Sequence, residues 1–344
     1  MPALAAAGTK RYTFVVSEAN SVSHSPAATA AVAQRAPDAA VKRWIRTELA
    51  ACPPRARSLI VTVWGDSIAP HGGAVWLSGL IELMAPFGIS ERLVRTSVYR
   101  LAQEGWLAAR SEGRRSLYRL TSQGARRFEH AYRRIYAVPS DCWNGEWDIV
   151  VAPLAALSAA DRAALRKELR WEGFGPIAPG LLVRPARTPS TDVGEIIASL
   201  GLAREAWMLR GQELDGVTGR LLPDVARDCW GLDAVSAEYR AFIRRFERAR
   251  RALGQRGARD PEQCFVVRTL LIHAFRRAIL HDPQLPAELL PSAWPGRAAF
   301  DLCRNLYRLT HARAERHLQA MLEGEHARLP PAAAYFYERF GGLR

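Results

Sequence analysis

The sequence predicts an α+β protein made of several consecutive domains. Three observations support this. Residues 55–137 combine apolar side chains at helical spacing with two short strand-like runs, and residues 147–214 alternate strand and helix patterns in the order βαββαβ. From residue 221 onward the pattern is helical throughout. We therefore expect domains over residues 46–137, 138–216 and 217–344, preceded by a tail over residues 1–45.

The expected tail is rich in alanine, serine and threonine, so we predict that residues 1–45 are disordered. No basic residue precedes Lys10, which speaks against a secretory signal. The most apolar stretch, residues 72–89, contains Glu82 and Pro86 and is too broken for a membrane span. The 5 cysteines form no C-x-x-C pair and are expected to be free thiols in a reducing cytosol. A cytoplasmic protein without a membrane partner is expected.

The first domain is predicted to begin with helices over residues 57–65, 76–85 and 91–104, separated by Gly- and Pro-containing breaks. Ser90 is a suitable N-cap for the third helix. When the third helix is drawn at 100° per residue, its core side consists of Val94, Ser97, Val98 and Leu101. Its opposite side carries donors and one aromatic ring, namely Arg92, Arg95, Thr96, Tyr99 and Gln103, with Arg100 at the edge.

A basic hairpin follows the third helix. Strands are expected over residues 106–109 and 116–120, joined by a turn that contains Gly113, Arg114 and Arg115. Thr121 then caps a helix that runs to about residue 137. Three helices and a basic hairpin in this order predict a winged helix-turn-helix, in which the third helix enters the major groove and the hairpin contacts the backbone. The alternative is a solvated basic face on an ordinary core helix.

The predicted DNA contacts combine the exposed face of the third helix with the hairpin turn. Arginine side chains in a groove read guanine through two acceptors, and arginines on the hairpin neutralise phosphate. The predicted set is Arg92, Arg95, Thr96, Tyr99, Arg100, Gln103, Arg114 and Arg115.

The charge of the chain supports an anionic partner. It carries 48 basic and 34 acidic residues, a formal net charge of +14. Residues 89–135 hold 11 arginines and 4 acidic residues, and residues 238–277 hold the same numbers. Each segment thus contributes 11 − 4 = +7, and the two together equal the whole net charge.

The second domain has the element order of a ferredoxin-like sandwich. Strands are expected over residues 147–154, 174–184 (a hairpin) and 205–214, with helices over residues 158–171 and 193–200. Asp148 could bind a metal ion if this domain were a nuclease. The alternative is a strand residue that is hydrogen-bonded locally.

The third region is predicted to contain long helices over residues 235–253, 262–280 and 301–323. Its second helix carries His273 close to Arg268, Arg276 and Arg277, either as an anion site or as a structural histidine. The chain contains no G-x-x-x-x-G-K-[ST], G-x-S-x-G or H-E-x-x-H motif, and its histidines lack metal-ligand spacing. We therefore expect no enzyme, no catalytic residue, no metal and no resident cofactor.

Several strings in the sequence resemble the PaaX family of transcriptional repressors of phenylacetic acid degradation operons. They are SLIVTVWGDSIAPHGGAVWLSGLIELMAPFGISERLVRTSVYRLAQEGWL (58–107), GRRSLYRLT (113–121), WEGFGPIAPG (171–180), RTLLIHAFRRAILHDPQLPAELLP (268–291) and AERHL (314–318). The resemblance covers about residues 55–318. It implies an N-terminal winged helix, a central domain similar to small CRISPR-associated nucleases, and a helical C-terminal domain. The residue after the family's motif histidine is commonly acidic, whereas Ala274 follows His273 here.

The resemblance also implies that the protein binds a double-stranded operator as a homodimer and is released by phenylacetyl-CoA, an aryl-CoA thioester. Such a ligand needs arginines for its phosphates and an apolar slot for its ring. The predicted effector site consists of Trp171, Arg268, His273, Arg276, Arg277 and Trp294. Two alternatives remain: a repressor in a related pathway that answers another acyl-CoA, and a metal-dependent nuclease that uses the central domain.

Overall fold

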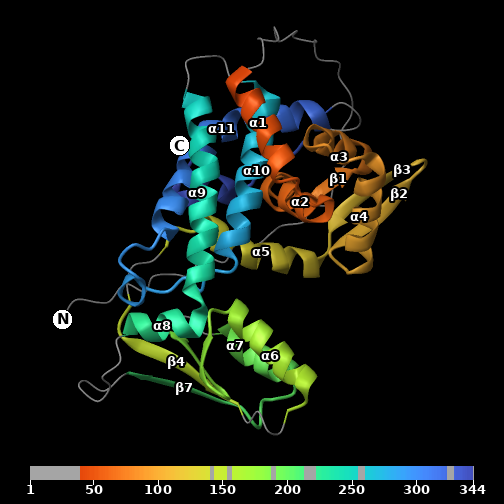
Figure 1. Cartoon of the computed structure of the whole chain (residues 1–344). Coiled ribbons are helices and arrows are strands. Elements are labelled where there is room, and N and C mark those ends of the chain that lie inside the picture. Colours follow the sequence, from red (N-terminus) through yellow and green to blue (C-terminus); the bar gives the residue numbers. More distant parts are fainter. Residues whose placement is uncertain are drawn as a thin grey trace, which may run out of the picture. The chain divides into compact units, whose positions relative to one another are not determined.

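The structure is a computed structural model of mixed helix and sheet, shown in Figure 1. It describes residues 39–139, 143–152, 157–186, 191–212, 222–254, 260–323 and 329–343. Residues 1–38, most of the expected tail, lie outside that range. The chain forms two compact units, and both are discontinuous in sequence. The first contains residues 1–137, 245–273 and 303–344, and the second contains residues 138–244 and 274–302. The predicted C-terminal region is thus divided between the two units.

Helix α1 (Ala39–Ala51) corrects the expected tail at its C-terminal end. Val41 and Trp44 are buried, and the Trp44 ring lies 5.5 Å from that of Phe246 in the same unit. Glu48 is also buried and forms an ion pair with Arg245. The helix is therefore ordered by contacts with a segment about 200 residues away, which composition alone does not reveal.

Six short elements lead to the most informative helix of the first unit. Helix α2 (Ala56–Val63) continues into a π-helical turn, η1 (Trp64–Ile68), and a 3-10 turn, η2 (Ala69–His71). Strand β1 (Ala74–Trp76) and helix α3 (Leu77–Met84) follow. A second 3-10 turn, η3 (Ala85–Phe87), precedes α4 (Glu91–Gln103). Trp76, predicted as the first residue of a helix, instead ends a strand.

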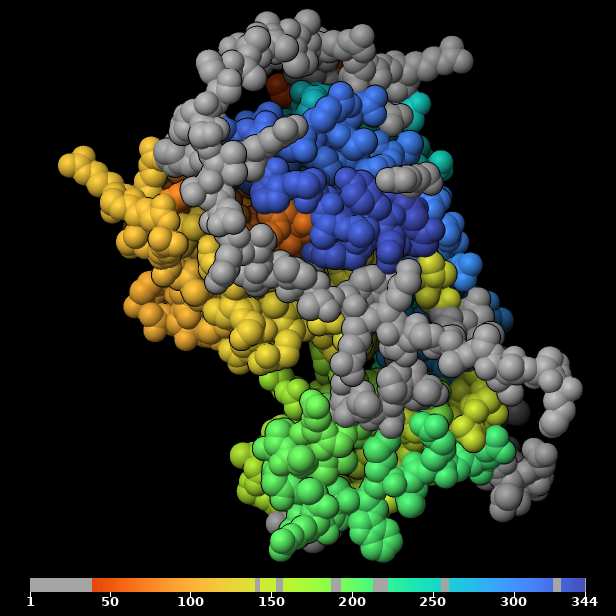
Figure 2. All heavy atoms as spheres, turned by 180° about the vertical axis from the view of Figure 1, so that it is seen from behind, coloured from red at the N-terminus to blue at the C-terminus, as the bar shows by residue number. Residues whose placement is uncertain are grey.

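The hairpin is longer than predicted and belongs to a three-stranded antiparallel sheet. Strands β2 (Leu107–Glu112) and β3 (Arg115–Leu120) pair along their whole length, and β1 adds to the other edge of β3. Helix α5 (Ser122–Tyr136) follows, and the Thr121 side chain accepts a hydrogen bond from the Gly124 N–H, as predicted for its cap. Figures 1 and 2 show that the hairpin projects from its unit.

Long C-terminal helices complete the first unit, and three of them contribute residues to both units. These three are α9 (Leu232–Gly254), α10 (Pro261–Ile279) and α11 (Gly296–Leu322). The chain ends with α12 (Ala334–Tyr337) and the 3-10 turn η6 (Arg339–Gly341). Residues 263–272 of α10 are all buried, which makes this helix part of the core.

The second unit contains a four-stranded antiparallel sheet with helices on both faces. Its strands are β4 (Glu146–Val151), β5 (Gly175–Ala178), β6 (Leu181–Pro185) and β7 (Trp207–Gln212), in the order β5-β6-β4-β7. Helices α6 (Ala159–Trp171) and α7 (Thr191–Ser199) share one apolar core with Val150. Helix α8 (Leu222–Trp230) and the 3-10 turn η5 (Ala287–Leu289) share another core with Val183. No helix in the described part of the chain is long and apolar enough to cross a membrane.

Candidate DNA interface

Helix α4 has one buried and one exposed face. Val94, Ser97, Val98 and Leu101 are buried, as the 100° projection predicts. The six α4 side chains among the eight predicted DNA contacts are all exposed, and Tyr99 is 61% exposed. An exposed tyrosine among arginines adds no core packing, so this face offers donors and one ring to an outside partner. Leu93, 49% exposed, lies on the same helix and was not among the predicted residues.

One ion pair involves an arginine of this face when no partner is bound. Arg95 donates to Glu91 one turn earlier, with an Nε–Oε1 distance of 2.8 Å. Both side chains are more than half exposed, so the pair contributes little stability and opens readily. Ser90 occupies the extended N-cap position, but its side chain makes no capping hydrogen bond.

The hairpin places two arginines at its tip. Arg114 lies in the turn beside Gly113, whose φ of +61° favours glycine, and Arg115 begins β3 opposite Glu112. Both arginines are exposed. The tip therefore offers exposed positive charge, as a contact to phosphate requires.

The second basic segment is exposed mainly along α9. Four exposed arginines recur there every three or four residues: Arg240, Arg244, Arg248 and Arg251. In the described residues none of the four forms an ion pair. This spacing puts them on one side of the helix, where they are available to a polyanion.

A buried polar network centres on Asp66, in the π-helical turn of the first unit. Its Oδ1 accepts hydrogen bonds from the hydroxyl groups of Tyr136 (2.6 Å) and Tyr307 (2.9 Å). Arg339 also donates to Oδ1, over 3.1 Å, and Arg268 Nε lies 3.1 Å from Oδ2. Burial, and then the charge of Asp66, raise the pKa of both tyrosines well above 10, although Arg339 opposes this. Both hydroxyls therefore stay protonated and donate to the carboxylate.

The network extends to Glu315 on α11. Glu315 accepts from Arg268 and lies 2.7 Å from His71 Nε2. Burial alone would raise the pKa of Glu315, but Arg268 and His71 outweigh it and lower the value to about 2. His71 Nδ1 lies 2.6 Å from the Pro330 carbonyl oxygen, so the imidazole ring links Glu315 to the C-terminal segment. Sequence reasoning missed this network, because its members lie up to 273 residues apart.

The six predicted effector residues are divided between the two units. Arg268 is fully buried, and its guanidinium is engaged by Asp66, Glu315 and Ser67. His273, in the same unit, contacts the Thr62 hydroxyl at 3.0 Å. The other four belong to the second unit: Trp171, Arg276, Arg277 and Trp294. Of these, Arg277 is exposed, and Trp294 is partly buried against the ring of Tyr239.

Asp148 lies on the central strand β4 and is 1% exposed. Its Oδ2 lies 3.2 Å from Arg184 Nε, and its Oδ1 lies 2.7 Å from Arg210 Nη2. These arginines are its direct neighbours on β6 and β7. Both carboxylate oxygens are thus paired with arginines on neighbouring strands of the sheet, in agreement with a local structural role. In the described residues no three His, Cys, Asp or Glu side chains are grouped to hold a metal ion.

Comparison with known proteins covers most of the chain. Residues 55–124 match the model of a PaaX-like protein, residues 140–222 the PaaX protein central Cas2-like domain, and residues 230–320 the PaaX-like protein C-terminal domain. The transcriptional repressor PaaX of Escherichia coli (strain K12) is 34% identical over 301 residues, which cover 87% of this chain and 94% of that protein. An uncharacterized protein, Rv0674 from Mycobacterium tuberculosis, aligns with a TM-score of 0.46 and 26% identity over 75% of this chain and 98% of that one. The chain therefore belongs to the PaaX family.

Proposed function

We propose that this chain is a transcriptional repressor that binds operator DNA and catalyses no reaction. The observation that carries the proposal is the exposed face of α4, which presents arginines, Tyr99 and Gln103 beside a projecting basic hairpin. Membership of the PaaX family supports it, because the E. coli relative is a transcriptional repressor.

In this proposal α2, α3 and α4 with the hairpin β2–β3 act as a winged helix-turn-helix. Helix α4 enters the major groove, where Arg92, Arg95 and Arg100 read base edges. Arg114 and Arg115 hold the adjacent backbone. The strand order β5-β6-β4-β7 with α6 and α7 supports a ferredoxin-like central domain. Operator binding as a homodimer rests on the family resemblance.

We propose further that the operon encodes aromatic, phenylacetate-type catabolism and that an aryl-CoA thioester, phenylacetyl-CoA first of all, releases the protein from DNA. This part rests on the resemblance. To shift the ratio of the state that does not bind DNA to the state that does from 1:99 to 99:1, the ligand must bind the first state more favourably by about 5.5 kcal/mol.

The operator test starts from duplex DNA selected by the protein from a random library. Arg95→Ala is expected to weaken binding to the selected sequence by about 1–3 kcal/mol and to relax its specificity. Arg166→Ala, a change of an exposed arginine on α6, serves as the control. Equal affinity of the Arg95 variant and the wild type for the selected duplex would contradict the proposal that α4 lies in the major groove.

The effector test adds phenylacetyl-CoA, phenylacetate and CoA separately to the protein–operator complex. Only the thioester is expected to dissociate it, as measured by fluorescence anisotropy of labelled DNA. If none of the three compounds dissociates the complex, the effector part of the proposal fails while the DNA-binding part stands.

A further inference from the structure

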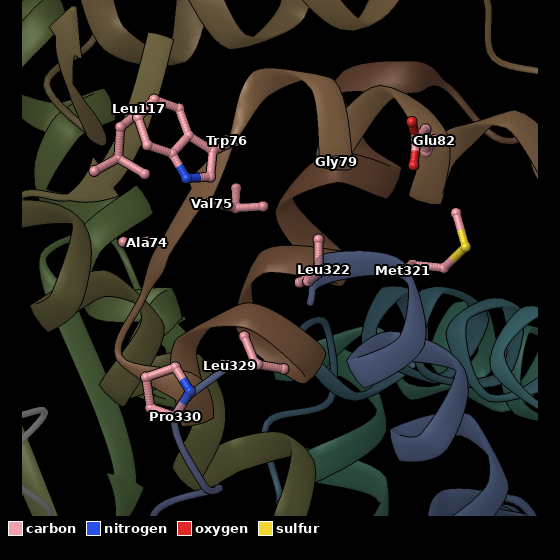
Figure 3. A pocket seen from close by; sticks show the side chains of 10 residues that line it. All are labelled: Ala74, Val75, Trp76, Gly79, Glu82, Leu117, Met321, Leu322, Leu329 and Pro330. Atoms are coloured by element: carbon pink, nitrogen blue, oxygen red, sulfur yellow. The ribbon is translucent and has the colours of Figure 1, made fainter. Parts of the chain in front are cut away.

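The first unit contains a cavity between its three-stranded sheet and the C-terminal end of α11. Its volume is about 140 Å³. One wall comes from β1, β3 and α3, and the other comes from α11 and residues 329–330, as Figure 3 shows. The lining residues are Ala74, Val75, Trp76, Gly79, Glu82, Leu117, Met321, Leu322, Leu329 and Pro330.

The size and lining of this cavity fit one aromatic ring. An apolar cavity of about 150 Å³ in another protein binds benzene, so a pocket of this volume is large enough for a ring of that size. Trp76 and Leu117 are direct cross-strand neighbours on β1 and β3, and both line the cavity. An indole beside aliphatic side chains is a favourable surface for a second aromatic ring.

Glu82 is the one ionisable side chain in the lining, and it is exposed. A carboxylate at the edge of an apolar cavity repels a ligand whose ring carries its own carboxylate. At about 6 Å in water, the repulsion of two unit charges is worth about threefold in affinity. The cavity therefore favours a ring whose polar substituent is uncharged, such as an amide or a thioester, over the free acid.

The walls of the cavity are elements on which the proposed DNA interface depends. Strand β3 pairs with both β1 and β2 and so forms half of the hairpin. Helix α3 is followed by the turn η3 and then by α4. At Gly79 it approaches α11 closely, since a Cβ there would lie 2.8 Å from Leu322 Cδ2. Leu322 therefore borders both the cavity and α3, so a ligand that displaces the Leu322 side chain changes the contact between α3 and α11.

We propose that this cavity is a ligand site for an aryl group with an uncharged polar substituent, and that its occupancy controls the hairpin and α4. The regulatory half rests on the proposed repressor function. The binding half does not, because it follows from the volume, the lining and Glu82. The site differs from the predicted effector residues named above, none of which lines this cavity.

The binding half is tested on the full chain without DNA. Phenylacetamide and phenylacetate are titrated by isothermal calorimetry or ligand-observed NMR. Phenylacetamide is expected to bind saturably, and phenylacetate to bind about threefold more weakly. The absence of saturable phenylacetamide binding would overturn the proposal.

Two variants, each with its own control variant, locate the binding site. Ala74→Leu puts extra volume into the cavity and is expected to weaken phenylacetamide binding about tenfold or more. Ala108→Leu, on exposed β2 outside the lining, is the matched control and should bind as the wild type does. Glu82→Gln, an exposed change that leaves the fold intact, should bring the affinities for acid and amide together, whereas Glu262→Gln should not.

The regulatory half uses the same variants with operator DNA. Phenylacetyl-CoA should release the wild type and Ala108→Leu, but should release Ala74→Leu only at about tenfold higher concentration. Equal release of the wild type and Ala74→Leu would place the aryl group elsewhere and overturn this half. A chain that binds phenylacetamide in the cavity but binds no operator would contradict the repressor function and leave the ligand site standing.

Discussion

Asp66 is the residue on which the buried network depends. It faces two guanidinium groups and two tyrosine hydroxyls, and its side chain is 1% exposed. Asp66→Asn would leave Arg268 and Arg339 buried without their shared counter-charge. Removing one partner of a buried charge pair costs about 3–5 kcal/mol. We expect a loss of that size in the free energy of urea-induced unfolding.

The control for Asp66 is Glu91→Gln, which breaks the exposed pair with Arg95. Exposed pairs contribute about 0–1 kcal/mol, so this variant should unfold almost as the wild type does. Similar losses in both variants would contradict the role given to the network.

Glu315 makes stability depend on acid pH. Its pKa is lowered to about 2 in the folded protein, because Arg268 and His71 outweigh the opposing effect of burial. A lowered carboxyl pKa contributes stability above the unfolded pKa of about 4.3, and that contribution is lost as the pH falls toward 2. The shift corresponds to about 3 kcal/mol. The free energy of unfolding, measured from pH 6 to pH 2, should show this decline. Glu315→Gln should have a lower free energy of unfolding at pH 6, and its free energy of unfolding should change less between pH 6 and pH 2.

Among the elements, the hairpin is predicted to supply affinity without sequence information. Replacing Arg114 and Arg115 together by alanine removes two phosphate contacts. Each contact contributes a slope of about −0.9 to log K against log salt, so the slope should become shallower by about 2. The ratio of the affinities for selected and random duplexes should stay unchanged, whereas Arg95→Ala should lower this ratio. An unaltered slope would show that the hairpin does not touch the DNA backbone.

Local patterns predicted the elements that depend on local contacts. The two faces of α4 follow from the spacing of Val94, Val98 and Leu101, and the cap at Thr121 follows from its own side chain. Strand β1 was not predicted, since three residues carry little periodicity and the strand exists through its pairing with β3. The extension of α2 into a π-helical turn was missed for a related reason, because Asp66 finds its partners in distant segments.

The same distinction separates the two candidate sites. The exposed face of α4 could be predicted, because helical periodicity tells which side is buried. The anion site around Arg268 could not be judged from its helix alone. Three arginines close together suggest a phosphate site, but Arg268 points inward to acids that lie 202 and 47 residues away in sequence. Which carboxylates a buried arginine meets is decided by the tertiary fold.

At the scale of the whole molecule, the first unit is assembled from both ends of the chain. Trp44 packs on Phe246, Tyr132 donates a 2.6 Å hydrogen bond to the Tyr335 carbonyl oxygen, and Asp66 meets Arg339. The segment predicted to bind DNA therefore supplies only part of the hydrophobic core of the first unit, and C-terminal segments supply the rest.

A fragment of residues 39–137 tests this dependence. It contains every predicted DNA contact, but it lacks residues 245–273 and 303–343, which cover Trp44, Asp66 and Tyr132. We expect the fragment to lose cooperative unfolding and near-ultraviolet circular dichroism, because a buried carboxylate and apolar side chains become exposed together. A sharp transition close to that of the full chain would contradict this. The segment would then be an independent domain, and coupling between α11 and the hairpin would have to act through rigid-body docking rather than through a shared core.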